Sequence, residues 1–251
     1  MCIIASKPQG IPLPSLKVLK HCWQSNPDGA GFCYIRQGQD AVTIQKGFMK
    51  FKTFYSALES AKLTDKDAVI LHFRIATHGL VDGGNCHPFP ISASPDDLRS
   101  LSIKTSISVA HNGIFGGMPA HTILSDTQKF VSKIMSNRHV INGINSSAVQ
   151  ELLRGYCGDS SKLAILTPKS HIHIGKFIEE DGMLYSNHGY KPYNNSYINK
   201  NTGYYNTCSA GKTTASRTCA YCEATTNVHY YTNLCTNLCD SCASYHLLEK
   251  D

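Results

Sequence analysis

The chain has 251 residues, enough for one large domain or for one domain and a small module. Apolar residues make up 41% of it, which suits a packed core and excludes a disordered chain. No apolar run approaches the roughly 20 residues that span a bilayer, and the first residues lack the pattern of a secretory signal. The formal charge of +6 permits an acidic partner without requiring nucleic acid. We therefore expect a cytoplasmic protein that makes no membrane contact.

The first part of the chain alternates short apolar runs with amphipathic stretches. A strand is expected over residues 2–6, and a helix that opens with a proline over 14–23. Two strands should follow at 31–35 and 41–47, and then a helix at 52–61 with its aromatic residues on one face.

Later elements follow the same alternation. Apolar runs predict strands over 68–73 and 107–111. Helices are expected over 125–135, capped at its start by a Ser-Asp pair, and over 147–156. Residues 163–180 should form a meander of three strands. Strands near both ends with helices between them predict an α+β fold.

A polar stretch separates this region from the C-terminus. Residues 182–222 contain no Asp or Glu and are rich in Asn, Tyr, Thr and Ser. We interpret residues 191–218 as a polar linker. Because basic and aromatic residues interleave here, the alternative is a segment that binds single-stranded nucleic acid.

The cysteines indicate a metal site in the tail. Six of the eleven fall within the last 45 residues, among them two CxxC pairs separated by sixteen residues. This spacing predicts a structural zinc ion, because each CxxC turn directs two sulfurs at one point. The four expected ligands are Cys219, Cys222, Cys239 and Cys242. Cys235 offers a poorer register, and Cys208 and His229 are reserve ligands. We expect a small zinc-binding module over 219–251, which could bind protein or nucleic acid.

Cys2 is the first candidate for chemistry. Removal of Met1 would leave a residue that carries both a thiol and a free α-amine. The thiol is a nucleophile, and an amine with a pKa of roughly 8 can act as its general base. Taken alone, a cysteine near the start of a chain also occurs by chance.

Five motifs downstream of Cys2 strengthen this interpretation. They are residues 26–31 (NPDGAG), 72–79 (HFRIATHG), 85–89 (NCHPF), 110–113 (AHNG) and 125–127 (SDT). In this order they resemble the class II glutamine amidotransferases, N-terminal nucleophile hydrolases that cut the side-chain amide of glutamine. The resemblance covers residues 2–190 and implies a four-layer αββα sandwich for that domain.

The resemblance also implies how glutamine would be held. Arg74, assisted by Thr77 and His78, would bind the α-carboxylate, since a guanidinium matches a carboxylate bidentately. Asp126 would bind the α-ammonium, although a carboxylate at a helix start can also be a simple N-cap. Asp28 would help to orient the α-amine of the nucleophile.

Asn112 and Gly113 are the expected oxyanion hole. A side-chain amide and a backbone N–H can stabilise the tetrahedral intermediate. The alternative is an ordinary Asn-Gly hairpin turn. His72 and His87 are expected to shape the pocket without taking part in the chemistry.

Three features depart from the family pattern. Ile3 follows the nucleophile in place of the usual glycine, and Gln128 stands where a glutamate is common. The chain also has no room for the synthase domain that usually consumes the ammonia.

Together these observations predict a glutamine amidohydrolase that supplies ammonia to a separate acceptor enzyme. Two alternatives remain open. One is an N-terminal nucleophile hydrolase that acts on another amide. The other is a zinc-containing nucleic-acid-binding or regulatory protein on an idle hydrolase fold.

Overall fold

The computed structural model describes residues 1–76, 80–117, 123–191, 226–231 and 236–239. The chain divides into two compact units, Met1–Asn194 and Asn195–Asp251, and each is considered on its own. In the described residues, no helix has the length and apolar character needed to cross a membrane.

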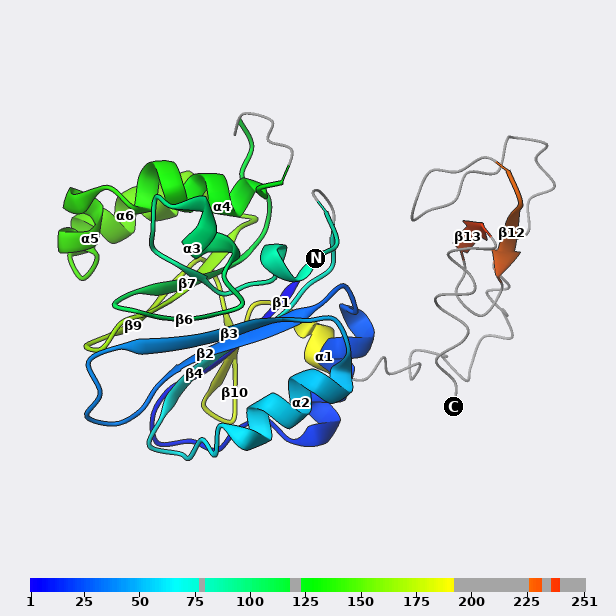
Figure 1. The fold of residues 1–251 in the computed structure, drawn as a ribbon, viewed down its shortest axis with the longest axis horizontal. Helices are drawn as coiled ribbons and strands as arrows, with labels where there is room; N and C mark the ends of the chain where they lie inside the picture. The colour runs from blue at the N-terminus through cyan, green and yellow to red at the C-terminus, as the bar shows by residue number, and fades with distance from the viewer. Residues whose placement is uncertain (77–79, 118–122, 192–225, 232–235, 240–251) are drawn as a thin grey trace, which may run out of the picture. The chain divides into compact units, whose positions relative to one another are not determined.

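A seven-stranded antiparallel sheet forms the centre of the first unit (Figure 1). Its strands in spatial order are β10 (Ile178–Glu180), β11 (Met183–Tyr185), β1 (Ile3–Lys7), β4 (Ala68–Phe73), β2 (Ala30–Ile35), β3 (Val42–Phe48) and β6 (Ser102–Thr105). Strand β1 lies between β11 and β4, and all five of its residues are buried. This explains why the strand opens with three consecutive apolar residues, Ile3, Ile4 and Ala5, and does not alternate apolar with polar residues.

A second antiparallel sheet lies against the first. Its four strands in order are β5 (Phe89–Pro90), β7 (Ser108–Asn112), β8 (Lys162–Leu166) and β9 (His171–Ile174). One hydrophobic cluster joins the two sheets, with Ile4 and Ile70 from the first and Ala110 and Ala164 from the second. Successive residues of β1 point to opposite faces, so Ile3 belongs to a different cluster.

Helices cover the two outer faces. Helices α1 (Leu16–Ser25) and α2 (Phe51–Ser60) pack on the first sheet. The second sheet is covered by α4 (Asp126–Phe130), the π-helical turn η2 (Val131–Met135), α5 (Arg138–Gly143) and α6 (Ser147–Cys157). The layers therefore run helix, sheet, sheet, helix (Figure 1). The expected α+β class is confirmed.

Several short elements were not predicted. They are α3 (Pro95–Arg99), α5, the strands β5, β6 and β11, and the 3-10 turns η1 (Gly83–Asn85) and η3 (His188–Tyr190). The helix expected over 125–135 changes hydrogen-bond pattern after Phe130 and continues as η2. The expected cap of the later helix is present, because Ser125 accepts from Gln128 N. At the start of α1, Ser15 accepts from Val18 N, a cap that was not predicted.

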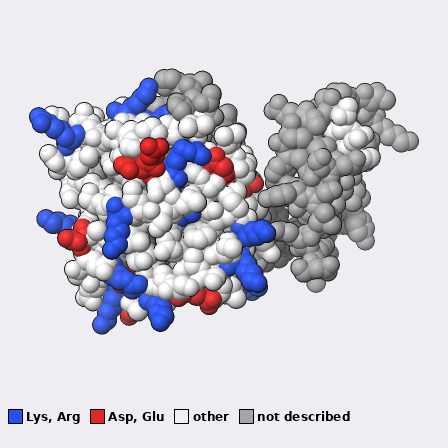
Figure 2. All heavy atoms as spheres, viewed as in Figure 1, with Lys and Arg blue, Asp and Glu red and all other residues white. Residues whose placement is uncertain are grey.

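Charged side chains are scattered over the face seen in Figure 2. Lysines and arginines gather in small groups at the lower left and at the right of this face, and acidic side chains stand beside several of the basic ones.

The second unit contains one described hairpin. Strand β12 (Val228–Tyr231) pairs antiparallel with β13 (Thr236–Cys239), and Val228 lies opposite Cys239. Cys239 therefore ends a strand. The other three expected zinc ligands, Cys219, Cys222 and Cys242, lie outside the described residues, as does the expected linker after Lys191.

Candidate active site

Cys2 lies directly before β1, at the end of a strand in the interior of the large sheet. Its Sγ atom is 3.5 Å from both the backbone N and the backbone O of Ile75. Burial raises the pKa of the thiol, and the Ile75 backbone and the positive charge of Arg74 oppose that rise in part. The thiol is therefore protonated at neutral pH in this setting, and reaction needs a base beside it.

Arg74 follows β4, and a tight loop holds its backbone. Its N donates to Gly29 O at 2.8 Å, and its O accepts from Asp28 N at 3.0 Å. Asp28 in turn accepts from Ala76 N at 2.8 Å. Gly29 has a φ of +115°, and a Cβ there would lie 2.5 Å from Cys86 Sγ, so only glycine fits. The Asp-Gly motif thus packs against the segment that carries Arg74.

Arg74 itself is 4% exposed, and its charge acts on several interior groups. It opposes in part the rise that burial causes in the pKa of Cys2, and it adds to the lowering that burial causes in the pKa of His72 and His87. The guanidinium therefore lies inside the protein near the nucleophile and two of the motif histidines, where water screens it weakly.

Asn112 ends β7 and is fully buried. Its side-chain amide lies 2.8 Å from Ser186 Oγ, which also accepts from Ile4 N at 2.9 Å. Next in the chain, Asn187 Nδ2 donates to Cys2 O at 2.7 Å. Two residues that the sequence did not single out, Ser186 and Asn187, therefore connect the nucleophile strand to the expected oxyanion donor.

Gly113 occupies a site that no other residue could enter without movement. Its φ is +152°, and a Cβ there would overlap the side chain of Ser161, with Ser161 Cβ only 2.7 Å away. The hairpin alternative for Asn112-Gly113 is wrong, because β7 pairs with β5 and β8 and the chain proceeds from Gly113 towards α4. The dipeptide marks the end of a buried strand.

Asp126 is the first residue of α4, but it is not the helix cap. Ser125 is the N-cap and forms a reciprocal capping box with Gln128. The Asp126 carboxylate accepts instead from Phe115 N at 2.7 Å. This bond ties the start of α4 to the segment that begins at Gly113, so Asp126 is adjacent in structure to the expected oxyanion hole.

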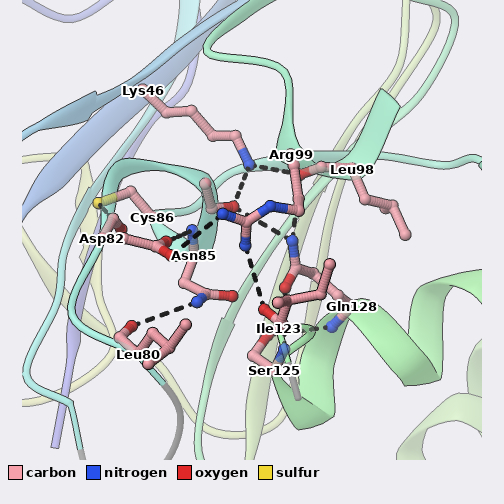
Figure 3. A network of polar contacts seen from close by, with 11 residues as sticks. Lys46, Leu80, Asp82, Asn85, Cys86, Leu98, Arg99, Ile123, Ser125 and Gln128 are labelled. Atoms are coloured by element: carbon pink, nitrogen blue, oxygen red, sulfur yellow. Dashed lines mark hydrogen bonds and ion pairs between the residues drawn. The ribbon is translucent and has the colours of Figure 1, made fainter. Parts of the chain in front are cut away.

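A buried lysine shares its acceptors with Gln128 of α4 (Figure 3). Lys46 Nζ donates to Gly84 O at 3.1 Å and to Leu98 O at 2.6 Å. Gln128 Nε2 donates to the same two carbonyls at 3.1 and 3.3 Å. The ammonium also lies 4.0 Å from the centre of the Phe89 ring. Burial lowers the pKa of Lys46 to about 7.

An ion pair strengthens the same region. Arg99 pairs with Asp82 at 3.0 Å and donates to Ile123 O at 3.1 Å (Figure 3). Asp82 accepts in addition from Asn85 N at 2.8 Å. The residues of η1 and the approach to α4 are therefore held by a contiguous polar network.

Three motif histidines form a buried layer. His72 Nε2 donates to His111 O at 3.0 Å, and the rings of His72 and His87 stack at 4.2 Å. His111 Nδ1 lies 2.8 Å from Thr127 Oγ1. Burial lowers the pKa of His72 and of His111 to about 3. These histidines stay neutral near pH 7, which fits the expectation that His72 and His87 shape the interior.

The structure thus connects five sequence-predicted residues through short paths of contacts and neighbouring residues. They are Cys2, Arg74, Asn112, Gly113 and Asp126. Thr77 and His78 lie outside the described residues. Among the described residues, no group of three or more His, Cys, Asp or Glu side chains could hold a metal ion. A scan of protein-family models gave no match to this chain, and neither did a search of curated proteins.

Proposed function

We propose that this protein is a glutamine amidohydrolase of the N-terminal nucleophile type, with Cys2 as nucleophile. The observation that supports this most is the setting of the thiol. It lies against Ile75 and near the Arg74 charge, while Asn187 and Ser186 tie its strand to Asn112. A thiol, a guanidinium and a side-chain amide therefore stand at the ends of three strands, β1, β4 and β7. The order of layers also agrees with the αββα sandwich of that hydrolase class.

The proposed substrate is L-glutamine because the charges suit an α-amino acid. Arg74 would bind the α-carboxylate, with Thr77 and His78 assisting it, and Asp126 would bind the α-ammonium. A simple amide carries neither charge, so an enzyme for another amide would not need both residues. The charge pair therefore favours glutamine over the alternative amide substrates.

The reaction needs a free amine on Cys2. After removal of Met1, this amine takes the thiol proton, and the thiolate attacks the side-chain carbonyl carbon of glutamine. The Asn112 amide and the Gly113 N–H stabilise the oxyanion that forms. Collapse of the intermediate expels ammonia, with the proton returned from the amine, and leaves a γ-glutamyl thioester. Water then attacks the thioester, which releases glutamate and restores the thiol.

The ammonia would pass to a separate synthase. The proposed catalytic residues all belong to the first compact unit, Met1–Asn194. We propose a protein partner as the ammonia acceptor. Nucleic acid remains a possible partner of the tail alone.

We also propose a structural zinc ion in the tail. The donor set, Cys219, Cys222, Cys239 and Cys242, is four thiolates in two CxxC pairs. The register of β12 and β13 supports this, because Val228 lies opposite Cys239. The first residue of β12 and the expected ligand Cys239 are thus paired at one end of the hairpin. When bound, zinc would supply folding free energy and no catalytic chemistry.

Assay of the purified full chain for glutamine hydrolysis, with mass spectrometry of its N-terminus, tests the function. We expect glutamate and ammonia from a chain that begins at Cys2. Cys2→Ser should reduce turnover by several orders of magnitude, because a serine hydroxyl is a far weaker nucleophile. Cys157→Ser is the matched control, since this buried thiol belongs to α6. Equal activity of wild type and Cys2→Ser would refute the function.

A second variant tests the self-activated mechanism. In this variant, an extra residue that cannot be removed precedes Cys2. The thiol stays in place, but the α-amine of Cys2 becomes part of a peptide bond. We expect a loss of turnover as large as that of Cys2→Ser. Full activity in a chain that retains Met1 would rule out the α-amine as the base.

A further inference from the structure

Ser186 has a single hydroxyl that meets two partners at the candidate active site. The residue follows β11, is 2% exposed, and its Oγ accepts from Ile4 N at 2.9 Å. The same Oγ lies 2.8 Å from the terminal amide of Asn112. Its backbone N also donates to Ile4 O at 3.0 Å, which fixes the residue against β1.

The orientation of the Asn112 amide follows from the hydrogen bonds around it. The two ends of a side-chain amide have nearly the same shape, so neighbours decide which end is which. With Nδ2 towards Ser186, the hydroxyl accepts two N–H groups, and among the described residues its own proton has no acceptor. Asn112 Oδ1 is then buried without a partner among the same residues. That orientation leaves the Ser186 hydroxyl proton and Asn112 Oδ1 without hydrogen-bond partners among the described residues.

Rotation of the amide by 180° gives both of these groups a partner, because the Ser186 hydroxyl then accepts from Ile4 N and donates its proton to Asn112 Oδ1. The NH₂ group then occupies the buried position that Oδ1 held. An N–H donor that is fixed in place before negative charge develops is what transition-state stabilisation requires.

We propose that Ser186 is a positioning residue that orients the Asn112 amide so that its NH₂ faces the developing oxyanion. This inference rests on the proposed function, since the oxyanion is that of glutamine hydrolysis. Ser186 touches neither substrate nor nucleophile and acts through Asn112. A purely structural role, in which the hydroxyl serves only Ile4 N, is the competing account.

Steady-state kinetics separate the two accounts. Loss of an entire oxyanion donor lowers kcat by about 10²–10³-fold, so loss of its alignment in Ser186→Ala should lower kcat by about 10–100-fold. The KM for glutamine should change by less than about twofold, because ground-state binding does not use the donor. Ser186→Thr keeps a hydroxyl and should retain most of the turnover. Unchanged kcat in a folded Ser186→Ala would overturn the proposal.

A double-mutant cycle supplies the decisive readout. If Ser186 acts through Asn112, Ser186→Ala should cause no further loss of kcat in an Asn112→Ala background. A structural role would give the same loss in either background, and that additive result would overturn the proposal.

Neutron crystallography of the wild-type protein tests the orientation without any assay. Nitrogen, oxygen and deuterium scatter neutrons differently, so the amide can be observed directly. We expect a deuteron on Ser186 Oγ that points to Asn112 Oδ1. An ND₂ group that faces Ser186 would overturn the inference. Absence of glutamine hydrolysis by the wild type, by contrast, would refute only the proposed function.

Discussion

Lys46 and Gln128 donate to the same two backbone carbonyls, those of Gly84 and Leu98. One side chain comes from β3 and the other from α4, so the pair joins a central strand to the helix that carries Asp126 (Figure 3). Because the acceptors are shared, neither carbonyl loses every donor when one of the two side chains is removed. The network can therefore be probed by substitution without leaving a buried carbonyl unpaired.

Lys46→Met should change how stability depends on pH. Burial lowers the pKa of Lys46 from 10.5 to about 7 in the folded protein, so above pH 7 the unfolded chain binds more protons at this residue. Wild-type stability should then gain about 1.4 kcal/mol per pH unit relative to the variant between about pH 7 and 10. Urea unfolding of both proteins from pH 6 to 9 measures this difference.

Lys104→Met is the control for that series, since Lys104 is an exposed residue of β6. Its stability difference from wild type should stay constant across the same pH range. A flat difference for Lys46→Met as well would mean that the Lys46 ammonium stays charged in the folded state.

Gly113→Ala should destabilise the protein and abolish turnover. The φ of +152° and the close approach of Ser161 both exclude a Cβ. The expected cost is about 2–4 kcal/mol, as for strained or overpacked buried positions. Gly116→Ala is the matched control, because a Cβ at Gly116 would meet no atom within 4 Å. Thermal unfolding of both variants provides the comparison, and equal melting temperatures would contradict this account of Gly113.

The long buried strands could be predicted from sequence because each is a continuous apolar run, as in β4 and β7. Short elements could not. Strand β5 has only two residues, one of them a proline that an edge strand tolerates, and α3 has five. Neither is long enough to show a period. The π-helical turn after Phe130 likewise leaves no mark on helical spacing.

The residues of the candidate active site also divide into those that the sequence could predict and those that it could not. The motif residues could be named because each belongs to a local pattern. Ser186 could not, since its role depends on the pairing of β11 with β1, residues far apart in the chain. Lys46 did carry a signal. It continues the buried face of β3 after Val42 and Ile44, and a lysine in that register is unusual.

Substitution of Arg74 and Asp126, the proposed substrate-binding residues, should separate binding from turnover. Asp126→Asn keeps an acceptor for Phe115 N but removes the charge, and Arg74→Ala removes the carboxylate partner. Both should mainly raise the KM for glutamine, because those charges exist before and during reaction. Asn112→Ala should instead lower kcat by about 10²–10³-fold. Steady-state kinetics that show the reverse division would mean that the roles are misassigned.

Removal of zinc should unfold the tail and leave glutamine hydrolysis largely intact. Metal binding by Cys219, Cys222, Cys239 and Cys242 would supply folding free energy to a segment with few large aliphatic residues. We therefore expect one zinc ion per chain by elemental analysis of protein purified without chelator. Cys219→Ser with Cys222→Ser should abolish zinc retention, whereas Cys208→Ser should not.

Chelator titration distinguishes a separate module from a coupled one. Protease sensitivity after about residue 219 should rise as zinc leaves, at constant glutaminase activity. The polar composition of residues 191–218 is the reason, because few apolar side chains there could couple the two folds. Protein that never contained zinc would defeat the metal proposal. Activity that declines in step with zinc loss would instead show that the tail contributes to the active site.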